Sequence, residues 1–319
     1  MRRIVFLAAL AALLAAAFVY AAWQGPGPAS APTRVTIAQG ATLTSAARTL
    51  RAAHAVRSAQ LFARLARVLG GPKPIMAGEY EIPAKASASA ILDLLQEGKV
   101  IQHLVTIPEG MPSILVQARL MAEPLLTGKI AIPDEGSILP DSYAFESGEP
   151  RAAVLKRMQA AMTSAIDEAW PKKTSASAVT SKREAIILAS IVEKETGIPA
   201  ERRTVAAVYT NRLRQGMKLQ ADPTIIYPVT KGKPLGRRIL QSELHADNGY
   251  NTYVMVGLPK GPIANPSRQS IAAVLDPARS PALYFVADGK GGHVFATTLA
   301  EHRANVERYY ALRRSRGEM

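Results

Sequence analysis

The chain has 319 residues and a formal net charge of +14, from 39 Lys and Arg against 25 Asp and Glu. Hydrophobic residues make up 48% of it, which excludes a wholly disordered chain, because such chains combine high charge with low hydrophobicity. The length predicts roughly two domains of about 150 residues each. Because there is no cysteine, disulfide scaffolds, cysteine nucleophiles and thiolate metal sites are excluded.

An uncharged segment of twenty residues, 4–23, follows Arg2 and Arg3. A helix of this length spans about 30 Å, the thickness of a bilayer core. Two arginines before the span and none just after it predict a single-pass anchor in the inner membrane. Residues 1–3 would then be cytoplasmic and the bulk of the chain periplasmic. A cleaved signal peptide and a buried helix of a soluble protein are the alternatives.

Residues 24–33, QGPGPASAPT, predict a flexible linker, because Pro, Gly, Ser and Ala cannot build a core. Residues 34–103 predict a small α+β module. Its expected strands are 34–37 and 78–83, and its expected helices are 41–54, 58–69 and 87–97. The order strand, helix, helix, strand resembles a LysM-like carbohydrate-binding module, with a spacer domain as the alternative. Residues 104–319 predict a larger α+β domain.

Residues 181–196 predict a buried helix that ends in two glutamates. Ser181 and Glu184 form a capping-box pattern, and the run 185–192 is apolar on nearly every side. Glu193 therefore sits at the end of a buried helix, where desolvation raises a carboxyl pKa toward the range that a general acid needs. Glu195 lies about 200° further round the helix, so both glutamates cannot face one cleft. A solvated helix end or an ion pair is the alternative for Glu193.

The loops that follow are rich in amide, hydroxyl and aromatic side chains. The densest are residues 219–224, 250–253, 257–266 and 284–289. Such side chains bind sugar rings by hydrogen bonds and stacking. Taken singly, each block is also ordinary turn sequence.

Five blocks together resemble the endolytic murein transglycosylases, the MltG or YceG-like family. They are VEKET (192–196), LQADPT (219–224), YNTY (250–253), GLPKGPIANP (257–266) and FVADG (285–289). Their order and spacing agree from about residue 104 to 310, and the N-terminal layout matches the family too. Ala221 departs from the threonine that is common in the family, and Ser142 stands where the family often has threonine.

The resemblance implies a membrane-anchored lytic transglycosylase. Such an enzyme cleaves the β-1,4 bond between N-acetylmuramic acid and N-acetylglucosamine in nascent peptidoglycan, consumes no water and leaves 1,6-anhydromuramic acid ends, which would terminate glycan elongation. The resemblance implies that Glu193 is the single catalytic acid and then the base. It implies substrate-binding roles for Gln220, Asp222, Tyr250, Asn251, Thr252 and Asn265. The expected partners are peptidoglycan strands, the membrane and peptidoglycan synthases.

The main rival interpretation is a non-catalytic peptidoglycan-binding membrane protein, which would need no desolvated carboxylate. Nucleic acid is not an expected partner, because the basic residues are spread along the chain and no nucleic-acid-binding signature is present. No lysine lies in a recognisable phosphate-binding context, so a pyridoxal-phosphate lyase is disfavoured and no cofactor is expected. No two of the five histidines are four residues apart, and we expect no metal.

Overall fold

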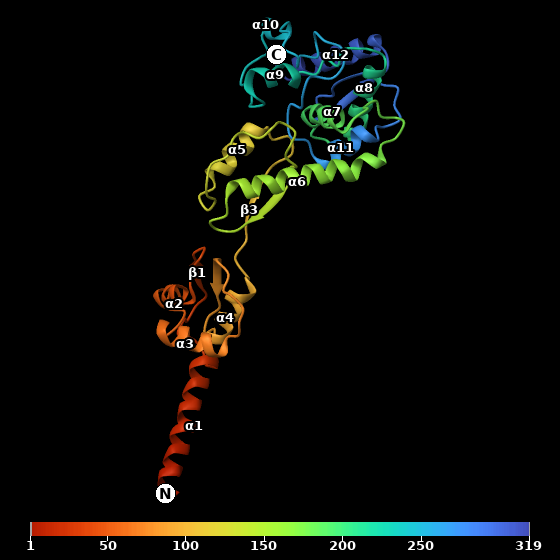
Figure 1. Cartoon of the computed structure of the whole chain (residues 1–319). Helices are drawn as coiled ribbons and strands as arrows, with labels where there is room; N and C mark the ends of the chain where they lie inside the picture. Colours follow the sequence, from red (N-terminus) through yellow and green to blue (C-terminus); the bar gives the residue numbers. More distant parts are fainter. Residues whose placement is uncertain (1, 319) are drawn as a thin grey trace. The chain divides into compact units, whose positions relative to one another are not determined.

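The computed structural model describes residues 2–318 and is a mixed α+β protein (Figure 1). The chain folds into two compact units. Unit 1 comprises Met1–His103 and the short segment Ala144–Glu149, and unit 2 comprises Leu104–Tyr143 and Pro150–Met319. The segment 144–149 thus belongs with the N-terminal unit, although the sequence predicts one uninterrupted domain from residue 104 onward.

Unit 1 begins with the long apolar helix α1, Arg2–Gln24. Within residues 2–318 it is the one helix that is long and apolar enough to cross a membrane. Its large side chains are exposed along its length, and Leu13 and Phe18 are 68% and 62% exposed. Apolar side chains in this number cannot face water without a large free-energy cost, so α1 is compatible with a membrane anchor.

The remainder of unit 1 packs helices against a two-stranded sheet. Strands β1 (Thr33–Ile37) and β2 (Gly78–Ile82) are antiparallel, with Val35 opposite Tyr80. Alternate side chains of both strands are buried, as expected for a sheet with one face on a core. Helices α2 (Leu43–Ala52), α3 (Ala59–Leu69) and α4 (Ala88–Glu97) complete the core. The predicted order of elements is present, and the LysM-like character of this unit stays a prediction.

The segment after α1 is held against unit 1 at several points, whereas the sequence predicts a flexible linker. The Gly27 amide donates to the Lys85 carbonyl (3.1 Å), and the Lys85 amide donates to the Ala29 carbonyl (2.8 Å). A Cβ at Gly27 would collide with the carbonyl oxygen of Ala86, so glycine permits this close approach. Trp23 is 8% exposed and lies 6.4 Å from the Phe62 ring, and is therefore part of the core of unit 1.

Unit 2 is built mainly of helices. They are α5 (Ser113–Ala122), α6 (Arg151–Ala169), α7 (Lys182–Glu195), α8 (Arg202–Arg214), α9 (Pro223–Thr230), α10 (Gln241–Leu244), α11 (Arg268–Leu275) and α12 (Leu299–Ser315), with short 3-10 turns at Trp170–Lys172 and Pro199–Glu201. Strands β3 (His103–Thr106) and β4 (Ser142–Phe145) form one two-stranded sheet. The hairpin of β5 (Tyr284–Ala287) and β6 (His293–Ala296) forms another.

Helix α7 lies at the centre of unit 2 and packs against α6, α8, α9 and α11 (Figure 1). Its residues 187–192 are all at most 4% exposed, which confirms the buried helix that the apolar run predicts. The side chain of Ser181 accepts a hydrogen bond from the Glu184 amide at the N-terminus. Thr196 adopts an extended conformation at the other end, and Pro199 follows shortly after. The helix therefore delivers Glu193 and Glu195 from a rigid core.

Candidate active site

The two glutamates at the end of α7 have different surroundings. Glu193 is enclosed, and its side chain is 4% exposed. One of its oxygens, Oε2, accepts hydrogen bonds from the backbone amide (2.8 Å) and the hydroxyl (2.6 Å) of Ser267. Its other oxygen, Oε1, lies 3.4 Å from the Arg202 guanidinium. Because Ser267 caps α11 and Arg202 begins α8, this carboxylate ties three helices together.

Glu195 lies on the other side of α7, in a pocket of about 270 Å³. The pocket is lined by Glu195, Tyr209, Arg212, Leu219, Gln220, Asp222, Tyr253, Phe285 and His302. These residues come from α7, α8, α12, β5 and two loops. The Tyr209 hydroxyl donates a hydrogen bond to Glu195 Oε1 at 2.9 Å. The angular separation that the sequence predicts for the two glutamates is thus present, and the pocket is on the Glu195 side.

The environment of Glu195 changes its acidity. Burial and, to a smaller extent, the nearby Asp222 carboxylate together raise the pKa of the Glu195 carboxyl to about 7, against the opposing effects of the Tyr209 hydroxyl and Arg212. A carboxyl with this pKa is present in both protonation states at neutral pH. Proton donation followed by proton acceptance requires both states, so Glu195 is suited to general acid–base chemistry.

Asp222 and Tyr253 form a hydrogen-bonded pair in the same pocket. The Tyr253 hydroxyl donates to Asp222 Oδ1 at 2.5 Å. Burial, together with this hydrogen bond and the charge of Asp222, raises the pKa of Tyr253, so the phenol stays protonated as a donor. The pair places a second carboxylate beside Glu195, oriented by a fixed donor.

Gln220 has a backbone φ of 51° in the left-handed region, which a residue with a side chain adopts at a cost. The backbone N–H of Gln220 donates a hydrogen bond to the Thr252 carbonyl at 3.1 Å. This bond holds the left-handed conformation. Arg212, 7% exposed, donates to the carbonyls of Leu219 and Leu283, each at 2.7 Å. These contacts fix the walls of the pocket.

The structure brings two of the six predicted substrate-binding residues, Gln220 and Asp222, into the Glu195 pocket. Asn251 and Thr252 are at most 1% exposed and lie outside its lining. Asn251 Nδ2 donates to the carbonyls of Glu243, Leu244 and Ala246, which closes the loop after α10. Thr252 Oγ1 accepts from the Ala221 amide at 3.0 Å. Both residues position the loops that carry Gln220 and Asp222.

Asn265 and Tyr250 also lie outside the lining of this pocket. Asn265 is fully buried; its Nδ2 donates to the Met111 carbonyl (2.9 Å) and its Oδ1 accepts from the Ile138 amide (3.0 Å). Tyr250 packs 5.0 Å from the Tyr227 ring, under the Lys260 ammonium. Amides and hydroxyls form internal hydrogen bonds as readily as bonds to sugars, so composition alone does not distinguish the two roles.

Sequence reasoning missed five side chains of the pocket, namely Tyr209, Arg212, Tyr253, Phe285 and His302. Tyr253 and Phe285 lie inside blocks that were recognised, whereas Tyr209 and Arg212 carry no local signal because their helix face depends on packing. The His302 ring stacks on Tyr284 at 5.2 Å, and burial lowers the pKa of His302, so it is neutral at neutral pH. In the described residues 2–318, no cluster of three or more His, Asp and Glu side chains could hold a metal ion.

Comparison with known proteins defines the family. The model of the YceG-like family matches residues 35–308, so the chain belongs to that family. The chain is 35% identical over 177 residues to an endolytic murein transglycosylase of Bacillus subtilis (strain 168), over 56% of this chain and 48% of that protein. It is 33% identical over 178 residues to an endolytic murein transglycosylase of Streptococcus pneumoniae serotype 2, and this match covers 54% of this chain and 31% of that protein. The matched region therefore spans about half or less of these relatives.

The fold is also similar to a solved structure. A YceG-like protein of Listeria monocytogenes, determined at 2.6 Å, superposes with a TM-score of 0.55 at 26% sequence identity. The match covers 86% of this chain and 98% of that one. The family and the fold thus agree with the resemblance that the sequence blocks indicate.

Proposed function

We propose that this protein is a lytic transglycosylase that cleaves the β-1,4 bond between N-acetylmuramic acid and N-acetylglucosamine in peptidoglycan. The observation that carries the proposal is a carboxyl with a pKa near 7, Glu195, in an open pocket on a rigid helix. Membership of the YceG-like family and the names of the two relatives support it. A glycan-binding protein without activity would need no carboxyl of this kind.

We assign the acid to Glu195, two residues after the glutamate that the sequence resemblance implies. Glu193 accepts two hydrogen bonds from Ser267 and lies beside Arg202. To admit a glycan at Glu193, its hydrogen bonds with Ser267 would have to break, which would disturb the packing of three helices. Glu195 has one neutral donor, Tyr209, and shares its pocket with polar side chains.

In the proposed reaction, protonated Glu195 gives its proton to the glycosidic oxygen as the bond from that oxygen to C1 of the muramic acid breaks. The Glu195 carboxylate then takes the proton of the C6 hydroxyl while O6 forms a bond to C1. The products are a free N-acetylglucosamine 4-hydroxyl and a 1,6-anhydro ring, and Glu195 is protonated again. The Tyr209 hydroxyl stabilises the intermediate carboxylate. Asp222 would stabilise the positive charge that develops at C1.

We further propose that α1 anchors the protein in the inner membrane by a single pass, with residues 1–3 in the cytoplasm and unit 2 in the periplasm. The length, hydropathy and exposure of α1 support this location. Glycan close to the membrane is newly made, so cleavage there would terminate nascent strands, beside the synthases that extend them. We also propose that unit 1 binds glycan as a LysM-like module.

Product analysis tests the reaction. Purified full-length protein is incubated with uncrosslinked glycan strands, and the new ends are identified by mass spectrometry. We expect 1,6-anhydromuramic acid at every new end. Asp222 supports one rival outcome, because a carboxylate across the pocket from the acid could activate water, as in glycosidases that use two carboxylates. Reducing ends in stoichiometric amount would therefore identify a hydrolase and refute the transglycosylase proposal.

A further inference from the structure

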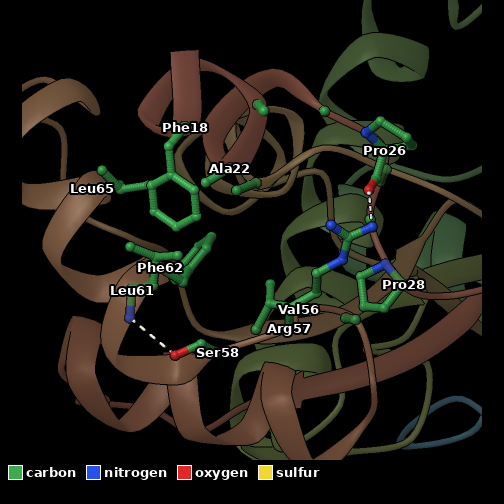
Figure 2. Close-up of a pocket in the computed structure, with 16 residues that line it drawn as sticks. Phe18, Ala22, Pro26, Pro28, Val56, Arg57, Ser58, Leu61, Phe62 and Leu65 are labelled. Atoms are coloured by element: carbon green, nitrogen blue, oxygen red, sulfur yellow. Dashed lines mark hydrogen bonds between the residues drawn. The ribbon is translucent and has the colours of Figure 1, made fainter. Parts of the chain in front are cut away.

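Unit 1 contains a cavity of about 360 Å³ where α1 meets the rest of the unit. Figure 2 shows the Phe18 ring of α1 beside Leu65 and Phe62 of α3, with Arg57 on the other side of the cavity near Pro26 and Pro28. The cavity belongs to unit 1 and is separate from the Glu195 pocket of unit 2. Nothing in the proposed reaction uses it.

The walls of this cavity are apolar. Its large side chains are Phe18, Val56, Leu61, Phe62 and Leu65. Two polar side chains of the lining, Ser58 and Arg57, have a partner within the chain. Ser58 Oγ accepts from the Leu61 amide (3.3 Å), and the Arg57 guanidinium donates to the Pro26 carbonyl (3.3 Å). A water molecule needs two to four polar partners, and apolar cavities stay dry and take apolar ligands. The part of this cavity lined by the large side chains therefore favours an apolar group.

The position of the cavity identifies the source of such an occupant. Phe18 and Ala22 belong to the same helix that is long and apolar enough to cross a bilayer. Phe18 remains 62% exposed while lining the cavity, so the cavity is open on the side of α1 that lipid would surround. At about 30 Å³ per water-sized group, its volume holds on the order of ten methylene groups, which corresponds to a large part of an acyl chain.

Charge supports a phospholipid in particular. Arg57 is exposed at the rim of the cavity, where a phosphate would meet it if the chain were inserted. Residues 34–103 contain nine Lys and Arg against four Asp and Glu. Basic residues near a membrane surface are attracted to anionic lipid headgroups. The Arg57 guanidinium at the rim and the net positive charge of residues 34–103 thus favour an anionic headgroup there.

We propose that this cavity binds one acyl chain of a membrane phospholipid, with the phosphate at Arg57. The lipid would fill the space between α1 and α3 and complete the packing of the anchor helix on unit 1. This inference rests on the membrane anchoring proposed above but is independent of the glycan chemistry. It assigns unit 1 a lipid-binding site in addition to the glycan-binding role expected of a LysM-like module.

Photo-crosslinking tests this site. The full-length protein is placed in nanodiscs of phosphatidylethanolamine and phosphatidylglycerol that contain a phosphatidylglycerol with a photoreactive acyl chain. The labelled peptides are mapped by mass spectrometry. We expect labelling of both the α1 peptide and the peptide that contains residues 58–69. The double variant Leu61→Trp/Leu65→Trp, which fills the cavity, should reduce labelling of the second peptide at least about fivefold and leave labelling of α1 unchanged.

The matched control is Val68→Trp/Leu69→Trp on the same helix, at side chains that are 80% and 47% exposed. It should leave labelling of both peptides unchanged, and thermal unfolding should show that both double variants are folded.

Equal labelling of residues 58–69 in the two double variants, or labelling of α1 alone, would overturn the lipid site while leaving the anchor in place. Loss of all labelling would refute the anchor, and displacement by unlabelled polyprenyl phosphate but not by phospholipid would overturn the assigned ligand. Glycan cleavage in the same samples reports on the proposed reaction separately.

Discussion

Glu193 and Glu195 lie two residues apart on one helix, and their surroundings differ in the number of donors. Glu193 meets two donors from Ser267 and the charge of Arg202, whereas Glu195 meets one phenol in a partly buried pocket. Burial raises the pKa of the Glu195 carboxyl to about 7. The comparison shows that burial alone does not identify a catalytic acid, since both glutamates are shielded. An open pocket beside the carboxyl does distinguish Glu195 from Glu193.

The largest effect is expected from Glu195→Gln. The amide has nearly the same shape but cannot transfer a proton, and general acid–base help contributes about 10²–10⁴-fold to a rate. We expect a loss of at least about 100-fold in the release of anhydromuramic ends from glycan strands. Glu193→Gln is the matched control and should retain most of the activity per folded molecule. If the two results were exchanged, the acid would be Glu193, as the sequence resemblance implies.

Glu193→Gln should instead lower the free energy of unfolding. The Ser267 donors can still bond to the amide oxygen, but the buried Arg202 loses a charged neighbour. Removing one partner from a buried, charged contact costs on the order of 1–3 kcal/mol. Urea unfolding of unit 2, followed by tryptophan fluorescence or circular dichroism, measures this loss. A stability equal to that of the unchanged protein would mean that Glu193 does not tie the three helices together.

Asp222→Asn should act on the acidity of Glu195. The Asp222 carboxylate contributes to the raised pKa of the Glu195 carboxyl, so its neutralisation should lower that pKa. Because the protonated form of Glu195 starts the reaction, activity should begin to fall at a lower pH than in the unchanged protein, with a lower rate at pH 7. Tyr253→Phe, which removes the hydrogen bond but keeps the charge of Asp222, is the control for the pH profile. An unshifted profile in Asp222→Asn would exclude this electrostatic coupling.

The smallest effect is expected from Tyr209→Phe. The Tyr209 hydroxyl lowers the pKa of the Glu195 carboxyl by donating to it, so its removal should raise that pKa. The decline of activity toward alkaline pH should therefore move to higher pH, while the maximal rate falls only a few-fold. A pH series of initial rates measures this shift. A shift in the opposite direction would show that the hydroxyl does not bond to the catalytic carboxyl.

Several features follow from local sequence alone. The capped start, the apolar run and the Gly-Pro end of residues 181–199 determine α7, since each acts within a few residues. The uncharged run of residues 4–23 determines α1 in the same way. The order of strands and helices in unit 1 was predictable because serine and threonine caps and alternating strand residues are local signals.

The roles of the loop residues depended on distant contacts. Asn251, Thr252 and Asn265 have the side chains of sugar-binding residues, but buried backbone groups take up their hydrogen bonds. Buried polar groups must be satisfied, and which groups satisfy them depends on how the loops fold over one another. Residues 24–33 have a linker composition, yet bonds to Lys85 hold part of this segment in place. Composition describes what a segment does in isolation, whereas the hydrogen-bond partners Arg57 and Lys85 lie 31 or more residues further along the chain.

Helical geometry determines from the sequence alone that Glu193 and Glu195 face opposite ways, because two residues advance a helix by about 200°. It does not determine which side is closed. Ser267 closes one side from 74 positions along the chain, and Tyr209 and Tyr253 form the other side from 14 and 58 positions away. A carboxyl's pKa is determined by the donors and the desolvation around it, and these exist only once the helices and loops have packed. The sequence by itself therefore determined the helix, the two glutamates and the family, and the tertiary structure decided which glutamate faces an open pocket.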